Sequence, residues 1–192
     1  MNFKTIFFAI FIIFFISCGD NENKENNTNN QQEQKESNAD NFNKFSTISL
    51  QFSNSSIGLG LKRTNENNKN LEFINNDNRA IMFIFFTTWC IPCKAEIPHL
   101  NNLYQKYKDK IRFIGILLED KSDKELKEFI ESNNINYEIA NSDANYLFVK
   151  SIDGVSGIPY MMLYNNKGKN INNYLGAVYE EMLDIDIQKV IQ

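Results

Sequence analysis

Apolar runs of strand length alternate with helical repeats from about residue 80 onward. The run 81–86 is continuous and has no polar face, which indicates a strand buried on both sides. From Pro92 to Tyr107, apolar residues recur at helical spacing, and a second apolar run at 111–118 follows. Strand, helix and strand in this order predict a parallel βαβ unit.

Weaker patterns complete the body of the chain. Ser122 and Glu125 have the spacing of a capping box, which predicts a helix as far as about Ser132. The remaining expected elements are a strand at 137–140, a helix near 143–150, a hairpin of 160–164 with a turn at 165–168 and a strand ending near 175–176, and a helix at 179–191 that closes one face of the sheet.

The region before the first buried strand is the hardest to interpret. Residues 48–52 alternate apolar and polar positions, as an edge strand does. The Asn-rich stretch 64–78 predicts loop and turn, with a short apolar insert at 71–74.

The N-terminus predicts export. Lys4 is the only charge in residues 1–17, and the apolar run 6–16 that follows it is too short for a bilayer core, which needs about 20 residues. This arrangement is typical of a signal peptide. The tetrapeptide 15–18 resembles the lipobox of bacterial lipoproteins, which implies that Cys18 is lipidated and becomes the first mature residue. An ordinary cleaved signal peptide or an uncleaved anchor is the alternative.

The amino-acid composition of residues 19–41 distinguishes a disordered tether from the domain that follows it. Residues 19–41 consist largely of Asn, Gln, Glu and Lys, with Ala39 as the only aliphatic side chain, and cannot bury enough apolar area to fold. The expected organisation is a signal peptide at 1–17, a lipidated cysteine with a disordered tether at 18–41, and one domain at 42–192. The net charge of −4 argues against a nucleic-acid partner.

Two cysteines carry the candidate chemistry. The segment 89–94, WCIPCK, directly follows the first buried strand, so Cys90 would lie at a helix N-terminus, where the dipole and free N–H groups stabilise a thiolate. This position favours thiol–disulfide exchange with Cys93. An inert structural Cys90–Cys93 disulfide stays open, because export permits disulfides. A complete zinc site would need Cys18 and His99 as well, and we expect no metal and no cofactor.

The order of elements, WCxPC after a buried strand and an Ile-Pro pair before a hairpin together resemble the thioredoxin superfamily. Within it, the chain is most similar to the exported, membrane-anchored TlpA/ResA-like thiol-disulfide oxidoreductases. The resemblance implies an α/β, thioredoxin-like fold over residues 42–192, with a central mixed sheet flanked by helices and an N-terminal β extension. The residues that carry it are Trp89, Cys90, Pro92, Cys93, Glu96, Pro98 and Pro159.

The resemblance also implies roles for single residues. Cys90 would be the exposed thiol that attacks a client disulfide, and Cys93 would resolve the mixed disulfide. The Ile158-Pro159 bond would be cis and would shape the groove that holds the client chain. The residues expected to line this groove are Trp89, Pro92, Ile158 and Pro159. For Trp89, plain core packing is the alternative to shielding the site.

Proton transfer is where the sequence departs from thioredoxin. The position of the buried acid of thioredoxins is occupied here by Ile84. Glu96, one helical turn after Cys93, corresponds to a glutamate of ResA-like proteins and could accept the Cys93 proton, unless it is simply an exposed charge. Lys94 either favours the thiolate or is only solvated. His99 has no partner evident in the sequence, and we expect it to be a surface or packing residue.

These observations predict an exported enzyme, a protein disulfide reductase anchored by lipid to a bacterial membrane and facing the periplasm or the cell exterior. Its expected partners are cysteine-containing proteins, which by family analogy could include apocytochrome c, and a membrane thiol donor. Two alternatives stay open. One is a non-catalytic binding lipoprotein with a structural disulfide. The other is a peroxidase, for which Thr87 has the required spacing, although Phe83 stands where those enzymes have proline.

Overall fold

The computed structural model describes residues 43–192, so the predicted signal peptide, Cys18 and the tether lie outside the described residues. The elements, in chain order, are β1 (Ile48–Phe52), β2 (Ser55–Arg63), β3 (Leu71–Ile74), β4 (Ala80–Phe86), α1 (Ile91–Tyr107), β5 (Ile111–Leu117), α2 (Asp123–Ser132), β6 (Glu138–Ala140), α3 (Ala144–Ser151), β7 (Tyr160–Tyr164), β8 (Asn170–Leu175) and α4 (Glu180–Val190).

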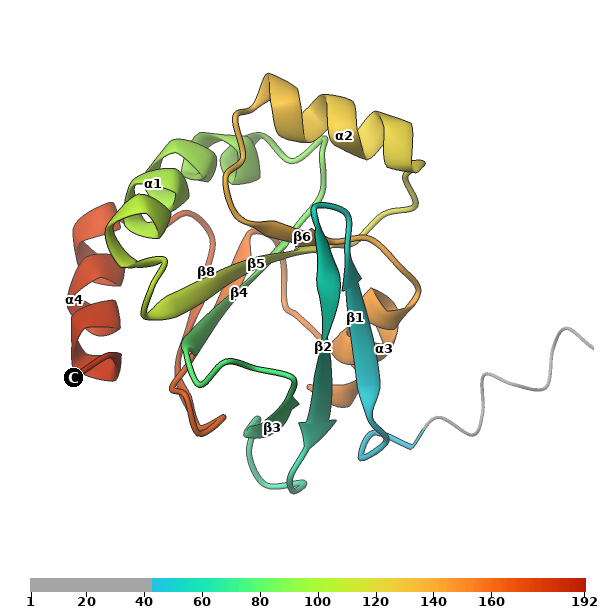
Figure 1. Ribbon diagram of the computed structural model, residues 1–192, viewed down its shortest axis with the longest axis vertical. Coiled ribbons are helices and arrows are strands. Elements are labelled where there is room, and N and C mark those ends of the chain that lie inside the picture. The colour runs from blue at the N-terminus through green and yellow to red at the C-terminus, as the bar shows by residue number, and fades with distance from the viewer. Residues whose placement is uncertain (1–42) are drawn as a thin grey trace, which may run out of the picture. The chain divides into compact units, whose positions relative to one another are not determined.

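The strands form one mixed sheet in the order β3-β2-β1-β6-β5-β4-β7-β8. Strands β4 and β5 are parallel and are joined through α1, which confirms the predicted βαβ unit. Strand β7 runs antiparallel to both β4 and β8, which confirms the predicted hairpin. The fold is the expected thioredoxin-like α/β arrangement (Figure 1).

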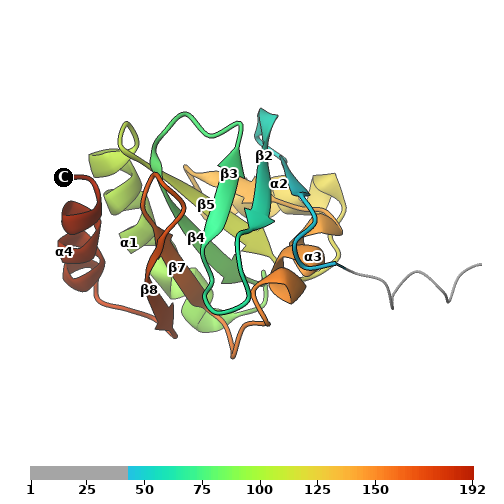
Figure 2. The same ribbon diagram turned by 90° about the horizontal axis from the view of Figure 1, so that it is seen from below.

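Helices cover both faces of the sheet. Helices α1, α2 and α4 pack on one face of the central strands, and α3 packs on the other (Figures 1 and 2). Side chains from the N-terminal strands β1, β2 and β3 join the core on the α3 face. Strand β4 supplies alternate side chains to the two cores, for example Met82 and Ile84 to one and Phe83 and Phe85 to the other. Because every residue of β4 is buried, its sequence is an unbroken apolar run.

The N-terminal β extension differs from its prediction in one respect. Strand β1 was expected at an edge, and this is wrong, because β1 pairs with β2 on one side and with β6 on the other. Strand β2 was not predicted, and the apolar insert at 71–74 is its partner β3. In β2, a Cβ at Gly60 would lie 2.9 Å from Cβ of Ile74, so glycine is needed for the two strands to approach.

Local helix signals are confirmed. Pro92 lies in the first turn of α1, where a missing N–H costs nothing. Ser122 and Glu125 form the predicted capping box at the start of α2. Within residues 43–192, no helix combines the length and the apolar character that crossing a membrane requires.

Candidate active site

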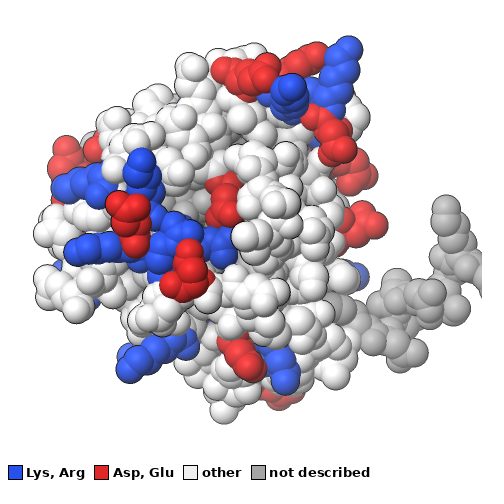
Figure 3. Space-filling model, in the orientation of Figure 1, with Lys and Arg blue, Asp and Glu red and all other residues white. Residues whose placement is uncertain are grey.

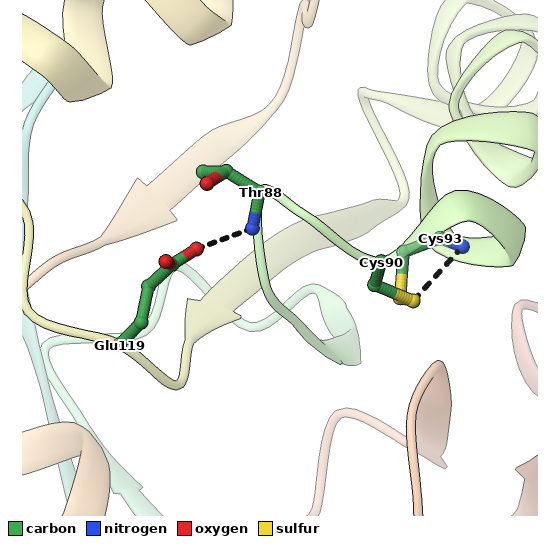
Figure 4. Close-up of a disulfide and its surroundings, with 4 residues drawn as sticks. All are labelled: Thr88, Cys90, Cys93 and Glu119. Carbon is green, nitrogen blue, oxygen red and sulfur yellow. Dashed lines mark hydrogen bonds between the residues drawn. A yellow bond between two sulfur atoms is a disulfide. The ribbon is translucent and has the colours of Figure 1, made fainter.

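The two cysteines lie where β4 leads into α1. Cys90 is the N-cap residue of α1, and its sulfur accepts a hydrogen bond from the main-chain N–H of Cys93 at 3.2 Å (Figure 4). The two sulfur atoms are 2.03 Å apart and form a disulfide. The helix N-terminus therefore points its N–H groups at the sulfur on which a thiolate would form.

The expected exposure of Cys90 is wrong for this oxidised state. Cys90 is 4% exposed and Cys93 is 5% exposed, and both belong to the apolar core between the sheet and α1. The neighbours of Cys90 are the exposed residues, with Trp89 at 68% and Ile91 at 77%. Core packing of Trp89 is thus excluded, and the two residues that flank Cys90 in the sequence expose apolar side chains.

The Ile158-Pro159 bond is cis, as expected from the resemblance. Tyr160, the next residue, pairs with Phe85 near the end of β4, so the sheet brings the Ile-Pro turn to the end from which the cysteine loop departs. Pro159 is buried and Ile158 is half-buried. Of the four residues expected to line the client groove, Trp89 and Pro92 are exposed.

Glu96 is a buried carboxyl group beside the cysteine pair. It lies one turn after Cys93 on α1 and is 3% exposed, which excludes the alternative of an exposed helix charge. Its Oε2 accepts a hydrogen bond from the Val178 N–H at 3.4 Å, while Oε1 has no partner within the described residues. Burial raises the pKa of Glu96, and the Val178 N–H and the nearby His99 act in the opposite direction.

Ile84 and Tyr137 are buried in the core that contains the two cysteines. Ile84 is buried in the same core as the cysteines, so the thioredoxin position offers no acid here. Tyr137 is buried in that core as well, and desolvation, followed by the charge of Glu96, raises the pKa of Tyr137. Glu96 is therefore the carboxyl group that the fold places near Cys93.

Sequence reasoning missed one residue that holds the cysteine loop. The carboxylate of Glu119, two residues after the end of β5, accepts a hydrogen bond from the main-chain N–H of Thr88 (Figure 4). An acidic residue at the end of a buried strand was the available signal. Thr87, the preceding residue, is buried, and its hydroxyl group has no partner among residues 43–192.

His99 has a partner that the sequence did not suggest. Its Nδ1 lies 3.0 Å from Oε2 of Glu180, the first residue of α4, and Asn102 donates to the same oxygen at 3.0 Å. These hydrogen bonds lower the pKa of Glu180. His99 is half-exposed, as expected for a surface residue, and Glu180 is the partner that was not evident in the sequence.

A cysteine pair at the strand-to-helix junction of this fold defines a protein of the thioredoxin-like class, and the comparisons with known proteins agree. Residues 78–170 match the family model described as thioredoxin-like. Thiol-disulfide oxidoreductase ResA of Bacillus thuringiensis subsp. konkukian is 30% identical over 122 residues, which are 64% of this chain and 69% of that protein. ResA of Bacillus subtilis is 27% identical over 117 residues, or 61% of this chain and 64% of its own.

The chain belongs to the ResA-like thiol-disulfide oxidoreductases of the thioredoxin superfamily. Solved structures support the fold. The thioredoxin domain of a thiol-disulfide oxidoreductase from Bacteroides vulgatus has a TM-score of 0.57 at 17% identity, covering 77% of this chain and 95% of its own. StoA from Bacillus subtilis has a TM-score of 0.51 at 24% identity, covering 62% of this chain and 92% of its own.

Proposed function

We propose that this thiol-disulfide oxidoreductase reduces disulfide bonds in exported client proteins through Cys90 and Cys93. The observation that carries the proposal is the position of Cys90 as N-cap of α1, with its sulfur accepting the Cys93 N–H. When the pair is reduced, this position favours a thiolate on Cys90, which is the species that attacks a disulfide.

The reaction has two displacement steps. The Cys90 thiolate attacks one sulfur of the client disulfide, which forms a Cys90–client bond and releases the other client sulfur as a thiolate that takes a proton from water. Cys93 then loses its proton and attacks the Cys90 sulfur, which forms the Cys90–Cys93 disulfide and releases the second client thiolate. Two electrons pass from the cysteine pair to the client.

Glu96 acts as the base in the second step. It lies one helical turn from Cys93, is buried, and has Oε1 without a partner among the described residues. Because burial raises the pKa of Glu96, its carboxylate is a better proton acceptor than an exposed glutamate would be.

The client is held by the exposed residues around the disulfide. Trp89 offers an apolar contact, and Ile158, just before the cis Pro159, offers its main-chain N–H and C=O to a chain lying in extended form, because the carbonyl oxygen of Pro159 already accepts the Gly176 N–H. On the face shown in Figure 3, acidic and basic side chains are intermixed rather than gathered by sign, which suits protein clients better than nucleic acid.

Export by the signal peptide and lipidation of Cys18 complete the proposal. An anchored domain would face the periplasm or the cell exterior, where disulfides persist, so a membrane thiol donor must return the electrons. Apocytochrome c is a candidate client by family analogy, because its haem-binding cysteines must be reduced before haem attaches.

The reduction potential of the Cys90–Cys93 pair in the full chain tests the direction of the reaction. A value at or below about −230 mV supports a reductase, and a value near −120 mV would make the protein an oxidant. A pair that never titrates in graded thiol buffers would instead be a structural disulfide, and a pair oxidised rapidly by micromolar peroxide alone would favour a peroxidase.

A trapping experiment identifies the clients. Cys93→Ser should accumulate mixed disulfides through Cys90, because the resolving thiol is absent. The matched Cys90→Ser variant should trap none. Equal trapping by both variants would contradict the assigned roles.

A further inference from the structure

An open cleft of about 510 Å³ lies between α1 and the segment that enters α4, directly beside Glu96. Its lining includes Glu96, His99, Val178, Glu180 and Glu181. Glu96 is only 3% exposed, and its Oε1 has no hydrogen-bond partner within residues 43–192. A buried carboxyl group thus borders a space wide enough for several water molecules, each of which takes about 30 Å³ in the liquid.

His99 stands in the same cleft with a fixed orientation. It follows Glu96 by one helical turn, so both side chains lie on one face of α1. Because hydrogen bonds from Asn102 and His99 lower the pKa of Glu180, that group is an anionic carboxylate that can only accept. Such an acceptor takes a hydrogen bond from Nδ1 of His99, 3.0 Å away, and Nε2 is the ring nitrogen that makes no hydrogen bond to the described residues.

We propose that His99, oriented by Glu180, carries the proton of Glu96 to solvent through this cleft. The inference rests on the proposed role of Glu96 as the base for Cys93. Before Cys93 resolves the mixed disulfide, the Glu96 carboxylic acid gives its proton to water in the cleft, and that water gives one proton to Nε2 of His99. The imidazolium ion then releases a proton to the bulk. One proton leaves the site, Glu96 is again a carboxylate, and no electrons move.

The other titratable groups around Glu96 are poor carriers. Tyr137 faces it from the core and stays neutral, because burial raises the pKa of that phenol. Glu180 is held as a carboxylate by its hydrogen bonds, and Tyr179 and Glu181 complete the titratable lining of the cleft. Imidazole is the side chain that ordinarily both takes and gives a proton between pH 5 and 8.

The test separates the two thiol steps in the full chain, reduced and purified in detergent. Reaction with the aromatic disulfide 5,5′-dithiobis(2-nitrobenzoate) releases one coloured thiolate when Cys90 attacks and a second when Cys93 resolves. His99→Ala should leave the first release unchanged and slow the second about fivefold near neutral pH, with the deficit vanishing at alkaline pH. Added imidazole should restore the second release in His99→Ala and have no effect on the wild type.

Matched variants make each outcome decisive. Glu180→Gln should slow the second release, whereas Glu181→Gln, with the same charge change in the same cleft, should not. His99→Gln, which preserves bulk at a half-exposed position, repeats the test should His99→Ala unfold.

Three results would overturn the inference. If His99→Ala leaves the second release unaffected, or slows it without rescue by imidazole, His99 is not on the proton path. A slow second release in Glu96→Gln would then still support Glu96 as the base. If Glu96→Gln itself resolves at the wild-type rate across pH, the proposed role of Glu96 fails instead.

Discussion

The main-chain N–H of Val178 lies 3.4 Å from Oε2 of Glu96 and donates to a carboxyl group that is otherwise buried. Burial is the largest influence on this group and raises the pKa of Glu96, while the single N–H partly offsets it. Glu96 therefore keeps its proton at pH values where an exposed glutamate has lost it. Both its chemistry and its contribution to stability depend on pH.

Glu96→Gln should make the oxidised protein more stable than the wild type at alkaline pH, with a difference that shrinks toward pH 4.5, the ordinary value for glutamate. Between that value and the raised pKa of Glu96, the folded state binds more protons than the unfolded state, so wild-type stability falls as pH rises. Glutamine has no charge to desolvate. Urea unfolding at several pH values measures this, with Glu181→Gln as the control, and a pH-independent difference would contradict it.

Glu119→Ala should lower the free energy of unfolding by about 1–2 kcal/mol, because the half-buried Thr88 N–H loses its acceptor. It should also slow the attack by Cys90, since Thr88 belongs to the loop that positions this thiol. Glu119→Gln is the matched variant and should retain most of both properties, because its amide oxygen can still accept. Denaturant unfolding and the rate of first thiolate release report the two effects. Equal losses in both variants would show that charge, not the hydrogen bond, matters.

Gly168→Ala should destabilise the protein by more than about 2 kcal/mol. Gly168 has φ +75°, and a Cβ there would lie 1.7 Å from the main-chain oxygen of Leu71, so the β7–β8 turn would have to separate from β3. Gly154→Ala is the control, because its φ of +89° carries a similar backbone cost while nothing lies within 4 Å. Thermal unfolding compares them, and similar losses would mean that the contact with Leu71 is unimportant.

Trp89→Ala should change the free energy of unfolding by no more than about 0.5 kcal/mol, because the ring is 68% exposed. It should nevertheless lower kcat/KM for a protein disulfide such as insulin, while reaction with a small aromatic disulfide stays near the wild-type rate. Ile57→Ala removes a side chain of matching exposure, 67%, from the N-terminal extension and should change neither rate. An unaltered kcat/KM for insulin would remove Trp89 from the client surface.

Local patterns predicted the parts of the fold that depend on a few neighbouring residues. The apolar run of β4, the helical repeat of α1 and the Ser122–Glu125 capping box lie within single elements, and the structure confirms them. Strand β2 was missed because its glycines interrupt the apolar pattern. These glycines are needed for close approach to neighbouring strands, as at Gly60 beside Ile74. Because β2 was missed, the sequence offered no partner for β1 on that side, and β1 was wrongly expected at an edge.

The sequence by itself determined the chemistry of the site: two cysteines in WCxPC after a buried strand, with Glu96 one turn beyond. Only the tertiary structure decided that Cys90 is buried when oxidised and that Glu96 is buried rather than solvated. The tertiary structure also decided the hydrogen-bond partners. Thr88 bonds to Glu119, 31 residues away in the sequence, and His99 bonds to Glu180, 81 residues away. The physical reason is that spacing, periodicity and capping act over a few residues, whereas desolvation and hydrogen bonding depend on what the rest of the fold places beside a side chain.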